Sequence, residues 1–308
     1  MVDRQQMAQA QVGKGGSILS LANDYLSMTK PPIILLLVVT AVGAMFLAAG
    51  GPPPLILMIL VCVGGALGAG GANALNNYLE QDIDSMMPRT AQRPVPGQRI
   101  SPRNALAFGI LLNVLSFALL ATWVNLWAAG LTMSATLFYV LVYTSWLKRS
   151  TPHNIVIGGA AGAIPPMVGW AAVTGGVDLP AVYLFAIVFF WTPPHFWALA
   201  LLIEKDYARA GIPMLPVVAG RPNTVANIFL YSIVLIALSL VFTLISPVGW
   251  IYLGSASALG AIFMILAWRL KQDDSRIRAK TLYLYSLLYL ALLFAAIMAD
   301  SAIGLGFP

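Results

Sequence analysis

Nine long apolar runs are the feature that most constrains how this chain can fold. They occupy roughly residues 31–50, 55–79, 104–123, 126–146, 154–174, 181–203, 224–244, 249–269 and 279–300. An α-helix needs about 20 apolar residues to cross the hydrocarbon core of a membrane. Only 9% of the residues are charged, against about 25% in soluble domains. The pattern predicts an all-α polytopic membrane protein with nine transmembrane helices, and it excludes a soluble globular domain. The third and fourth runs are separated only by Val124 and Asn125.

The cationic residues are distributed unevenly between the segments that join these runs. With the N-terminus in the cytoplasm, all 17 Lys and Arg residues fall on the cytoplasmic side, in the N-terminal segment, in the connections after runs two, four, six and eight, or at the adjoining ends of runs eight and nine. Only Asp178 and Asp300 are charged on the opposite side. The positive-inside rule therefore predicts a cytoplasmic N-terminus and a C-terminus outside. The net charge of +6 indicates topology and contact with anionic membrane lipid, not nucleic-acid binding.

The N-terminal part of the chain is more polar than the rest. Residues 1–16 are expected to be disordered and to contain no secretory signal, and residues 17–29 to lie on the membrane as an interfacial helix. We expect a disordered or interfacial segment over 1–22 and a single transmembrane domain over 23–308. The one cysteine, Cys62, excludes a disulfide framework and a multi-cysteine metal site.

Asn76, Glu80 and Asp84 follow one another at four-residue spacing at the end of the second run. At about 100° per residue they drift only about 80° around a helix, so they form one stripe. Two carboxylates and an amide oxygen suit a hard cation such as Mg²⁺. Asp82 lies about 200° from Glu80, so we expect it to point off the stripe and to pair with a basic residue. The alternative is a solvated helix end beside an ordinary charged loop.

Further charged residues lie in the connections on the same side of the membrane. Those that could contact a diphosphate are Arg89, Arg93, Lys148, Arg149 and Lys205. Asp206 is a candidate for a further metal ligand. Ordinary positive-inside anchoring explains Lys148 and Arg149 equally well, and a capped, solvated loop is the alternative for residues 204–207.

His195 is the one histidine inside an apolar run, after Pro193 and Pro194 and among aromatic residues. An ionisable group at membrane depth favours a functional role. The flanking aromatic rings suit a flat macrocycle, so His195 is a candidate for holding the acceptor substrate. The alternative is a structural histidine bonded to a carbonyl that Pro193 or Pro194 leaves free.

Several of these segments together resemble the UbiA-type intramembrane aromatic prenyltransferase superfamily, and within it the heme O synthase branch. The segments that carry the resemblance are Asn76 to Asp84, Met87 to Pro94, Tyr143 to Ile155, Trp191 to Trp197 and Asp206 to Pro216. The likeness extends over about residues 23–300. The chain departs from the family in lacking an aspartate four residues from Asp206, where Leu202 and Ala210 stand.

The resemblance implies nine helices around a central cavity and transfer of a farnesyl group from farnesyl diphosphate to the vinyl group of heme B. The products are heme O and diphosphate, and Mg²⁺ is the implied cofactor. Asn76, Glu80, Asp84, Arg89 and Arg93 are the implied catalytic residues. The resemblance further implies an inner (plasma) membrane protein with a cytoplasmic active site. Heme A synthase and other oxidase-assembly factors are the candidate protein partners.

Two other functions are compatible with the same segments. A prenyltransferase for a quinone or chlorophyll-type acceptor would share the acidic stripe but should lack the Pro-Pro-His segment. A secondary transporter would also have many spans and polar residues at depth. Release of diphosphate that depends on magnesium separates an enzyme from a transporter, and the acceptor separates the two enzymes.

Overall fold

The computed structural model describes residues 18–304, in which every regular element is a helix. The helices are α2 (Ile18–Thr29), α3 (Pro31–Ala49), α4 (Leu55–Leu79), α5 (Gln81–Met86), α6 (Pro102–Trp123), α7 (Leu126–Leu137), η1 (Phe138–Leu147), α8 (Lys148–Ser150), α9 (Asn154–Ala163), α10 (Pro165–Thr174), α11 (Leu179–Leu202), α12 (Glu204–Arg209), α13 (Leu215–Ile245), α14 (Trp250–Gln272) and α15 (Arg276–Ile303). Within the described range, nine helical segments are long and apolar enough to cross a membrane. The predicted all-α, nine-span architecture is confirmed.

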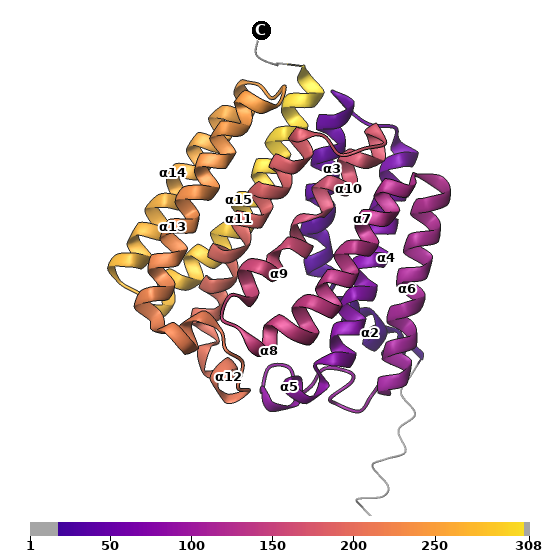
Figure 1. The fold of residues 1–308 in the computed structure, drawn as a ribbon, viewed down its shortest axis with the longest axis vertical. Coiled ribbons are helices and arrows are strands. Elements are labelled where there is room, and N and C mark those ends of the chain that lie inside the picture. Colours follow the sequence, from indigo (N-terminus) through magenta and orange to yellow (C-terminus); the bar gives the residue numbers. More distant parts are fainter. Residues whose placement is uncertain (1–17, 305–308) are drawn as a thin grey trace, which may run out of the picture.

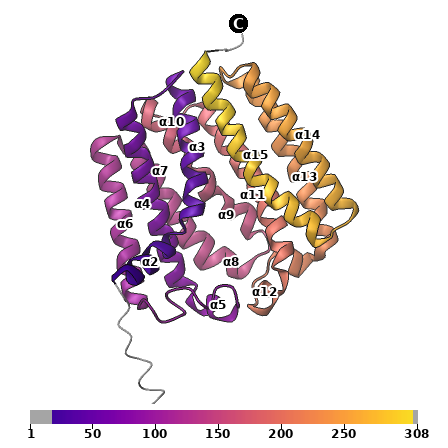
Figure 2. The same cartoon turned by 180° about the vertical axis from the view of Figure 1, so that it is seen from behind.

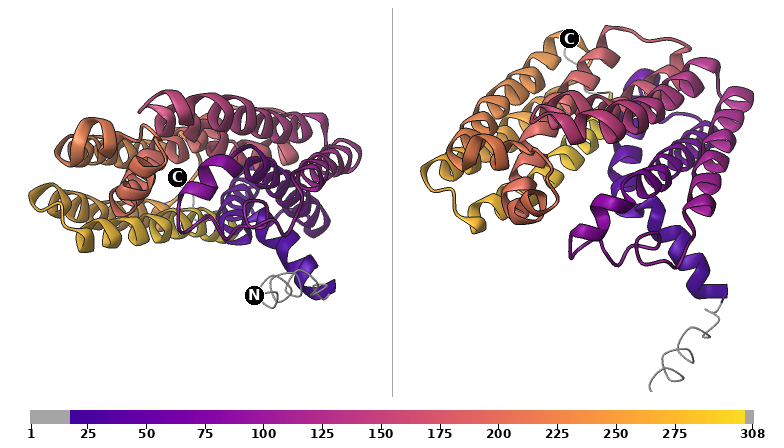
Figure 3. Two further views of the ribbon diagram at one scale, coloured as in Figure 1. Left: turned by 90° about the horizontal axis from the view of Figure 1, so that it is seen from below. Right: turned by 60° about the horizontal axis from the view of Figure 1, so that its bottom comes forward.

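The long helices run side by side in one bundle (Figure 1). The first span, α3, packs against α10 and against the last span, α15 (Figure 2). α4 packs mainly against α6, and α11 packs against α9, α13 and α15. Seen from below, the spans surround the middle of the bundle, and the short helices α5 and α12 lie at the near end (Figure 3). The connections that carry the candidate site therefore meet at one end of the molecule.

The fifth and sixth spans form the inside of the bundle. They are the most buried of the nine, and Leu184 and Ile187 of α11 are fully buried. α10 lies very close to α3, because a Cβ atom on Gly169 would stand only 2.0 Å from the carbonyl oxygen of Ala41. Glycine permits this approach of two helix backbones.

Two span boundaries differ in detail from the sequence prediction. The break between the third and fourth spans is a true helix start, because Asn125 accepts a hydrogen bond from the N–H of Ala128 at 2.8 Å and caps α7. The seventh span begins at Leu215 rather than near residue 224. It contains a kink at Gly220, whose φ of 77° is open to glycine at little cost. The predicted connection over residues 204–223 is therefore largely helical.

The fourth span changes helix type halfway along. α7 passes into η1, a π-helix of 10 residues, and then into the short α8. Such π segments are rare and often occur at functional sites. From this segment Thr144 of η1 contacts Asn76 of α4, and Lys148 of α8 contacts Glu80 directly after α4. Gly158 leaves room for the ring of Tyr143, since a Cβ there would lie 2.2 Å from Tyr143 Cδ2.

α2 occupies the place of the predicted interfacial helix. Its Ile18, Leu19 and Leu26 are largely exposed, as expected of a helix whose apolar side meets lipid. The segment predicted to be disordered, residues 1–16, lies outside the described residues. The division of the chain at residue 22 stays a prediction.

Candidate active site

The predicted acidic stripe is built across a break between two helices. α4 ends at Leu79, and Glu80 has φ −99° and ψ 11° before α5 begins. The four-residue register survives the break, because the N–H of Glu80 donates to Asn76 O (2.9 Å) and the N–H of Asp84 donates to Glu80 O (2.7 Å). Asn76, Glu80 and Asp84 are all buried, with exposed fractions of 2%, 1% and 1%. The three oxygen-bearing side chains point into the protein rather than into solvent.

Each of the three side chains contacts a cation that comes from a different part of the chain. The pairs are Lys30 with Asn76 (Nζ to Oδ1, 2.9 Å), Lys148 with Glu80, and Arg93 with Asp84 (Nη1 to Oδ2, 2.7 Å, and to Oδ1, 2.9 Å). Buried charges in proteins are normally paired in this way. The contacts join the junction between α2 and α3, the helix α8 and the connection after α5 to one acidic stripe.

Lys30 is a site residue that the sequence analysis did not identify. It has a left-handed backbone conformation (φ 56°, ψ 62°) between α2 and α3. Residues other than glycine, asparagine and aspartate rarely adopt this backbone conformation. Backbone strain of this kind is often found at functional sites. Burial, aided by the charge of Arg93, lowers the pKa of Lys30 to about 7.

Glu80 is ionised despite its burial. Burial alone raises the pKa of this carboxyl, but the charge and hydrogen bond of Lys148, together with the charges of Lys30 and Arg93, bring the pKa below its usual value. Asn76 is oriented from the other side, because its Nδ2 donates to Thr144 Oγ1 at 3.2 Å. Its Oδ1 therefore points with the carboxylates toward the cations.

Asp82 lies off the stripe, as predicted. It is exposed and contacts Arg149 through two hydrogen bonds, of 2.7 Å and 2.8 Å. These hydrogen bonds lower the pKa of Asp82. Arg149, which was expected to contact a diphosphate, is thus held by Asp82 and by the carbonyl of Leu79, whereas Lys148 reaches the stripe.

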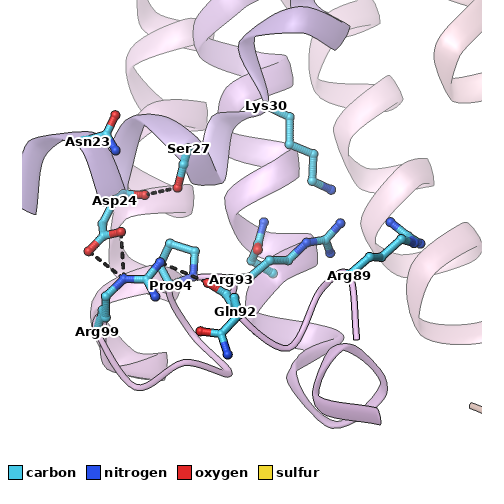
Figure 4. Close-up of a pocket in the computed structure, with 10 residues that line it drawn as sticks. Asn23, Asp24, Ser27, Lys30, Arg89, Gln92, Arg93, Pro94 and Arg99 are labelled. Carbon is cyan, nitrogen blue, oxygen red and sulfur yellow. Dashed lines mark hydrogen bonds and ion pairs between the residues drawn. The ribbon is translucent and has the colours of Figure 1, made fainter. Parts of the chain in front are cut away.

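A pocket with a cationic wall opens beside these pairs (Figure 4). Lys30, Arg89, Arg93 and Arg99 line it, and Asp24 is its one carboxylate. Arg99 is neutralised by Asp24 at 2.9 Å, but Arg89 has no ion pair among the described residues. The pocket can therefore receive an anion that carries several oxygen atoms.

The short helix α12 stands after a break at Ile203, much as α5 follows Glu80. Within residues 18–304 the one ion pair of Asp206 is with Arg209, at 3.8 Å, and Glu204 pairs with Arg221 at 3.1 Å. Lys205 is exposed and forms no ion pair within residues 18–304. The structure does not bring the predicted cation Lys205 or the predicted ligand Asp206 into the stripe.

Tyr207 is the buried residue of α12. Burial raises the pKa of its phenol. The charges of Arg89 and Glu80 also act on this phenol, in opposite directions. α5 and α12 lie at the same end of the bundle (Figures 1 and 3).

The oxygen atoms of the stripe suit a magnesium ion. Asn76 Oδ1 and the carboxylates of Glu80 and Asp84 are hard donors, on one face and withdrawn from bulk water. Among residues 18–304 no three His, Cys, Asp or Glu side chains gather as a metal site, so Asp206 does not join Glu80 and Asp84 here. The fit rests on an amide and two carboxylates.

His195 lies inside α11 and is 6% exposed. Its Nδ1 is 2.7 Å from Ser286 Oγ of α15. Trp191 and Tyr283 stack on its ring with centroid distances of 4.4 Å and 4.9 Å. Within residues 18–304 the hydrogen-bond partner of the imidazole is a hydroxyl group, not a carbonyl left free by Pro193 or Pro194.

The sequence profile of the UbiA prenyltransferase family matches residues 36–299. The chain is 50% identical over 284 residues to a protoheme IX farnesyltransferase of Roseiflexus castenholzii, covering 92% of this chain and 53% of that one. The chain thus spans about half the length of the first curated relatives it matches. A protoheme IX farnesyltransferase of Gloeobacter violaceus is 50% identical over 280 residues, covering 91% of this chain and 92% of its own.

Solved structures share the fold at low sequence identity. A digeranylgeranylglyceryl phosphate synthase superposes with a TM-score of 0.76 at 16% identity, covering 92% of this chain and 99% of its own. A UbiA homolog from Archaeoglobus fulgidus bound to GPP and Mg²⁺ superposes with a TM-score of 0.63 at 18% identity, covering 89% and 99%.

Proposed function

The chain belongs to the UbiA prenyltransferase family, and from this membership we propose that it transfers a farnesyl group from farnesyl diphosphate to a vinyl group of heme B. The observation that carries the proposal is the 50% identity to a protoheme IX farnesyltransferase, which extends over nine-tenths of both chains. The buried acidic stripe with its three cations supports the diphosphate half of the reaction. The aromatic surroundings of His195 support the heme half.

The diphosphate would enter the pocket beside the stripe. Lys30, Arg89 and Arg93 line this pocket, so they can contact the phosphate oxygens. Lys148 is held by Glu80 nearby and can join them when the carboxylate has another partner. These cations would stabilise the negative charge that develops on the leaving diphosphate as the allylic C–O bond breaks.

Asn76, Glu80 and Asp84 are the residues that would hold Mg²⁺. A bound magnesium ion supplies Lewis-acid stabilisation of the diphosphate oxygens. The carboxylates now contact Lys148 and Arg93, so loading of the stripe would free both cations for the substrate. The UbiA homolog from Archaeoglobus fulgidus solved with GPP and Mg²⁺ supports a metal-dependent site in this fold. Asp206 and Lys205 would have to move toward the stripe to act as a further ligand and a further cation.

The acceptor would lie deeper in the bundle. His195 stands seven residues before the end of α11 at Leu202, which is about 10 Å at 1.5 Å per residue. A macrocycle held at His195, by its iron or by a propionate, would place a vinyl group deeper in the bundle than the diphosphate. The farnesyl C1 then bonds to the terminal vinyl carbon, and the hydroxyl group of a water molecule bonds to the inner one. Diphosphate and the remaining proton of that water leave.

The cationic connections lie at one end of the bundle, which supports a cytoplasmic active site in the plasma membrane with the C-terminus outside. A reporter attached after Pro308 should then be extracytoplasmic.

The proposed activity is tested by incubating the purified protein with heme B, farnesyl diphosphate and Mg²⁺ and measuring product mass. We expect heme O, diphosphate release that requires Mg²⁺, and no product from phenolic acceptors. Prenylation of a phenolic acceptor instead of heme B would identify a quinone-type enzyme. Uptake of ligand into vesicles without diphosphate release would identify a transporter.

A further inference from the structure

Ser286 is the contact point between α15 and the His195 region of α11. It is completely buried. Its backbone carbonyl accepts a hydrogen bond from Trp191 Nε1 at 2.7 Å, and its hydroxyl lies 2.7 Å from His195 Nδ1. The same hydroxyl donates to the carbonyl of Tyr283 at 2.7 Å. Ser286 thus contacts the imidazole and both of the residues whose rings stack on it.

The hydrogen bonds of this serine determine where the imidazole proton lies. A serine hydroxyl has one proton to donate and two lone pairs to accept. The Tyr283 carbonyl can only accept, so the serine proton is directed to it. A neutral imidazole bears one proton, and Nδ1 must then be the nitrogen that donates to Ser286. Nε2 consequently carries a free lone pair.

The remaining nitrogen of His195 is available to a ligand. Trp191 and Tyr283 stack nearly parallel to the imidazole ring, at 16° and 28°. Within residues 18–304 Nε2 has no hydrogen-bond partner. It is also not completely closed off from solvent. The ring is held by its two stacking partners, by an edge contact with Phe196 at a centroid distance of 5.0 Å and by the hydrogen bond at Nδ1, and Nε2 is its one nitrogen without a hydrogen bond among the described residues.

We infer that Ser286 is a positioning residue that holds His195 as the Nδ1–H tautomer, so that Nε2 presents a lone pair to the iron of the heme acceptor. This inference rests on the proposed function and sharpens it. A propionate would require a donor at Nε2, whereas iron requires a lone pair. In many metal sites the histidine ligand donates its second N–H to an oxygen partner, which fixes the tautomer and makes the ligand nitrogen more basic.

The tautomer is measured without heme by NMR of ring-¹⁵N histidine. His153→Gln leaves His195 as the only histidine of the chain. We expect a protonated Nδ1 and an unprotonated Nε2 in this protein. Ser286→Ala should yield a mixture of tautomers or the Nε2–H form, and Ser286→Thr, which keeps the hydroxyl, should restore the Nδ1–H form. Ser232→Ala removes another buried hydroxyl, one that bonds only to a backbone carbonyl, and should leave the tautomer unchanged.

Heme binding is then measured on the same variants by titration with ferric heme and absorbance. We expect Ser286→Ala to weaken heme binding by about 10–100-fold, the usual effect of removing such an oxygen partner. Farnesyl diphosphate affinity should not change, and Ser286→Thr and Ser232→Ala should bind heme like the parent. His195→Ala should abolish the spectrum of a nitrogen-ligated heme.

Two results would overturn the inference. One is a protonated Nε2 in the parent protein, and the other is an unchanged heme affinity and spectrum in a folded Ser286→Ala variant. Either result leaves farnesyl transfer to heme intact if the product assay detects heme O. Failure of that assay in a protein with the Nδ1–H tautomer and a nitrogen-ligated heme would contradict the proposed function and support the role of Ser286.

Discussion

The C-terminal ends of helices α4 and α11 are alike in backbone shape and different in chemistry. At each, a long span stops at a residue outside helical geometry, Glu80 or Ile203, and a helix of six residues follows. The α5 end has two buried carboxylates paired with cations: Glu80 with Lys148, 68 residues away, and Asp84 with Arg93, nine residues away. The α12 end has one half-buried aspartate that contacts a neighbour three residues away.

The difference indicates a division of work between the two ends. The α5 end is held in place by tertiary contacts over 46 to 68 residues of sequence, so its oxygen atoms are positioned before a ligand arrives. At the α12 end Glu204 is held by Arg221, but within residues 18–304 the carboxylate of Asp206 pairs only with Arg209 of its own helix, so this carboxylate can move at lower cost. We expect substitutions at the α5 end to be far more damaging than equivalent ones at the α12 end.

Lys148→Met should have the largest effect, on stability. It leaves Glu80 buried without its cation, at a cost of about 3–5 kcal/mol in the free energy of unfolding. In the parent protein the lowered pKa of Glu80 means that its contribution is present above the unfolded pKa of about 4.3 and is lost as pH falls through the folded value. In the variant, burial raises that pKa, so the stability deficit should shrink as the pH is lowered.

Thermal unfolding at several pH values measures this effect. Arg149→Met, at an exposed neighbour, is the matched control and should lose less than about 1 kcal/mol. Equal losses in the two variants would remove the distinction between a buried and an exposed cation at this end. Adding Glu80→Gln to Lys148→Met should recover part of the stability.

Asp84→Ala should reduce turnover by about 10²–10³-fold, the usual effect of removing one group that stabilises developing charge. It removes one of the two stripe carboxylates and leaves Arg93 without its partner. The measurement is single-turnover farnesyl transfer on protein that still inserts into the membrane. Near-normal farnesyl transfer by this variant would contradict the assignment of the stripe as the metal site.

Asp206→Asn should be milder. The carboxylate is not assembled with Glu80 and Asp84, so we expect about a tenfold loss of turnover, equivalent to ~1.4 kcal/mol in the barrier. A loss as large as that of Asp84→Ala would mean that α12 closes onto the stripe in the working enzyme.

Asp82→Ala should have the smallest effect. Its ion pair with Arg149 is exposed and is worth less than about 1 kcal/mol of stability. Turnover should stay within a few-fold of that of the parent, which corresponds to a change of less than about 1 kcal/mol in the activation barrier. A strong loss of turnover would show that Arg149 needs Asp82 in order to reach the substrate.

The sequence predicts the spans well because a helix in lipid needs a continuous apolar stretch, which is visible without any partner. It also predicts the stripe and the different direction of Asp82, because one helical period relates them. Lys30, Ser286 and the π-helix η1 could not be predicted in this way. The role of Lys30 depends on a left-handed backbone, Ser286 meets His195 across 91 residues, and η1 has the composition of an ordinary span.

The most direct test is the magnesium dependence of substrate-analogue binding at the two ends. Titration of a non-hydrolysable farnesyl diphosphate analogue, with and without Mg²⁺, is compared in the parent protein, Asp84→Asn and Asp206→Asn. We predict that Mg²⁺ strengthens binding in the parent and in Asp206→Asn but not in Asp84→Asn, because we propose that the metal binds at the α5 end. Magnesium-dependent binding that survives in Asp84→Asn and disappears in Asp206→Asn would contradict this division.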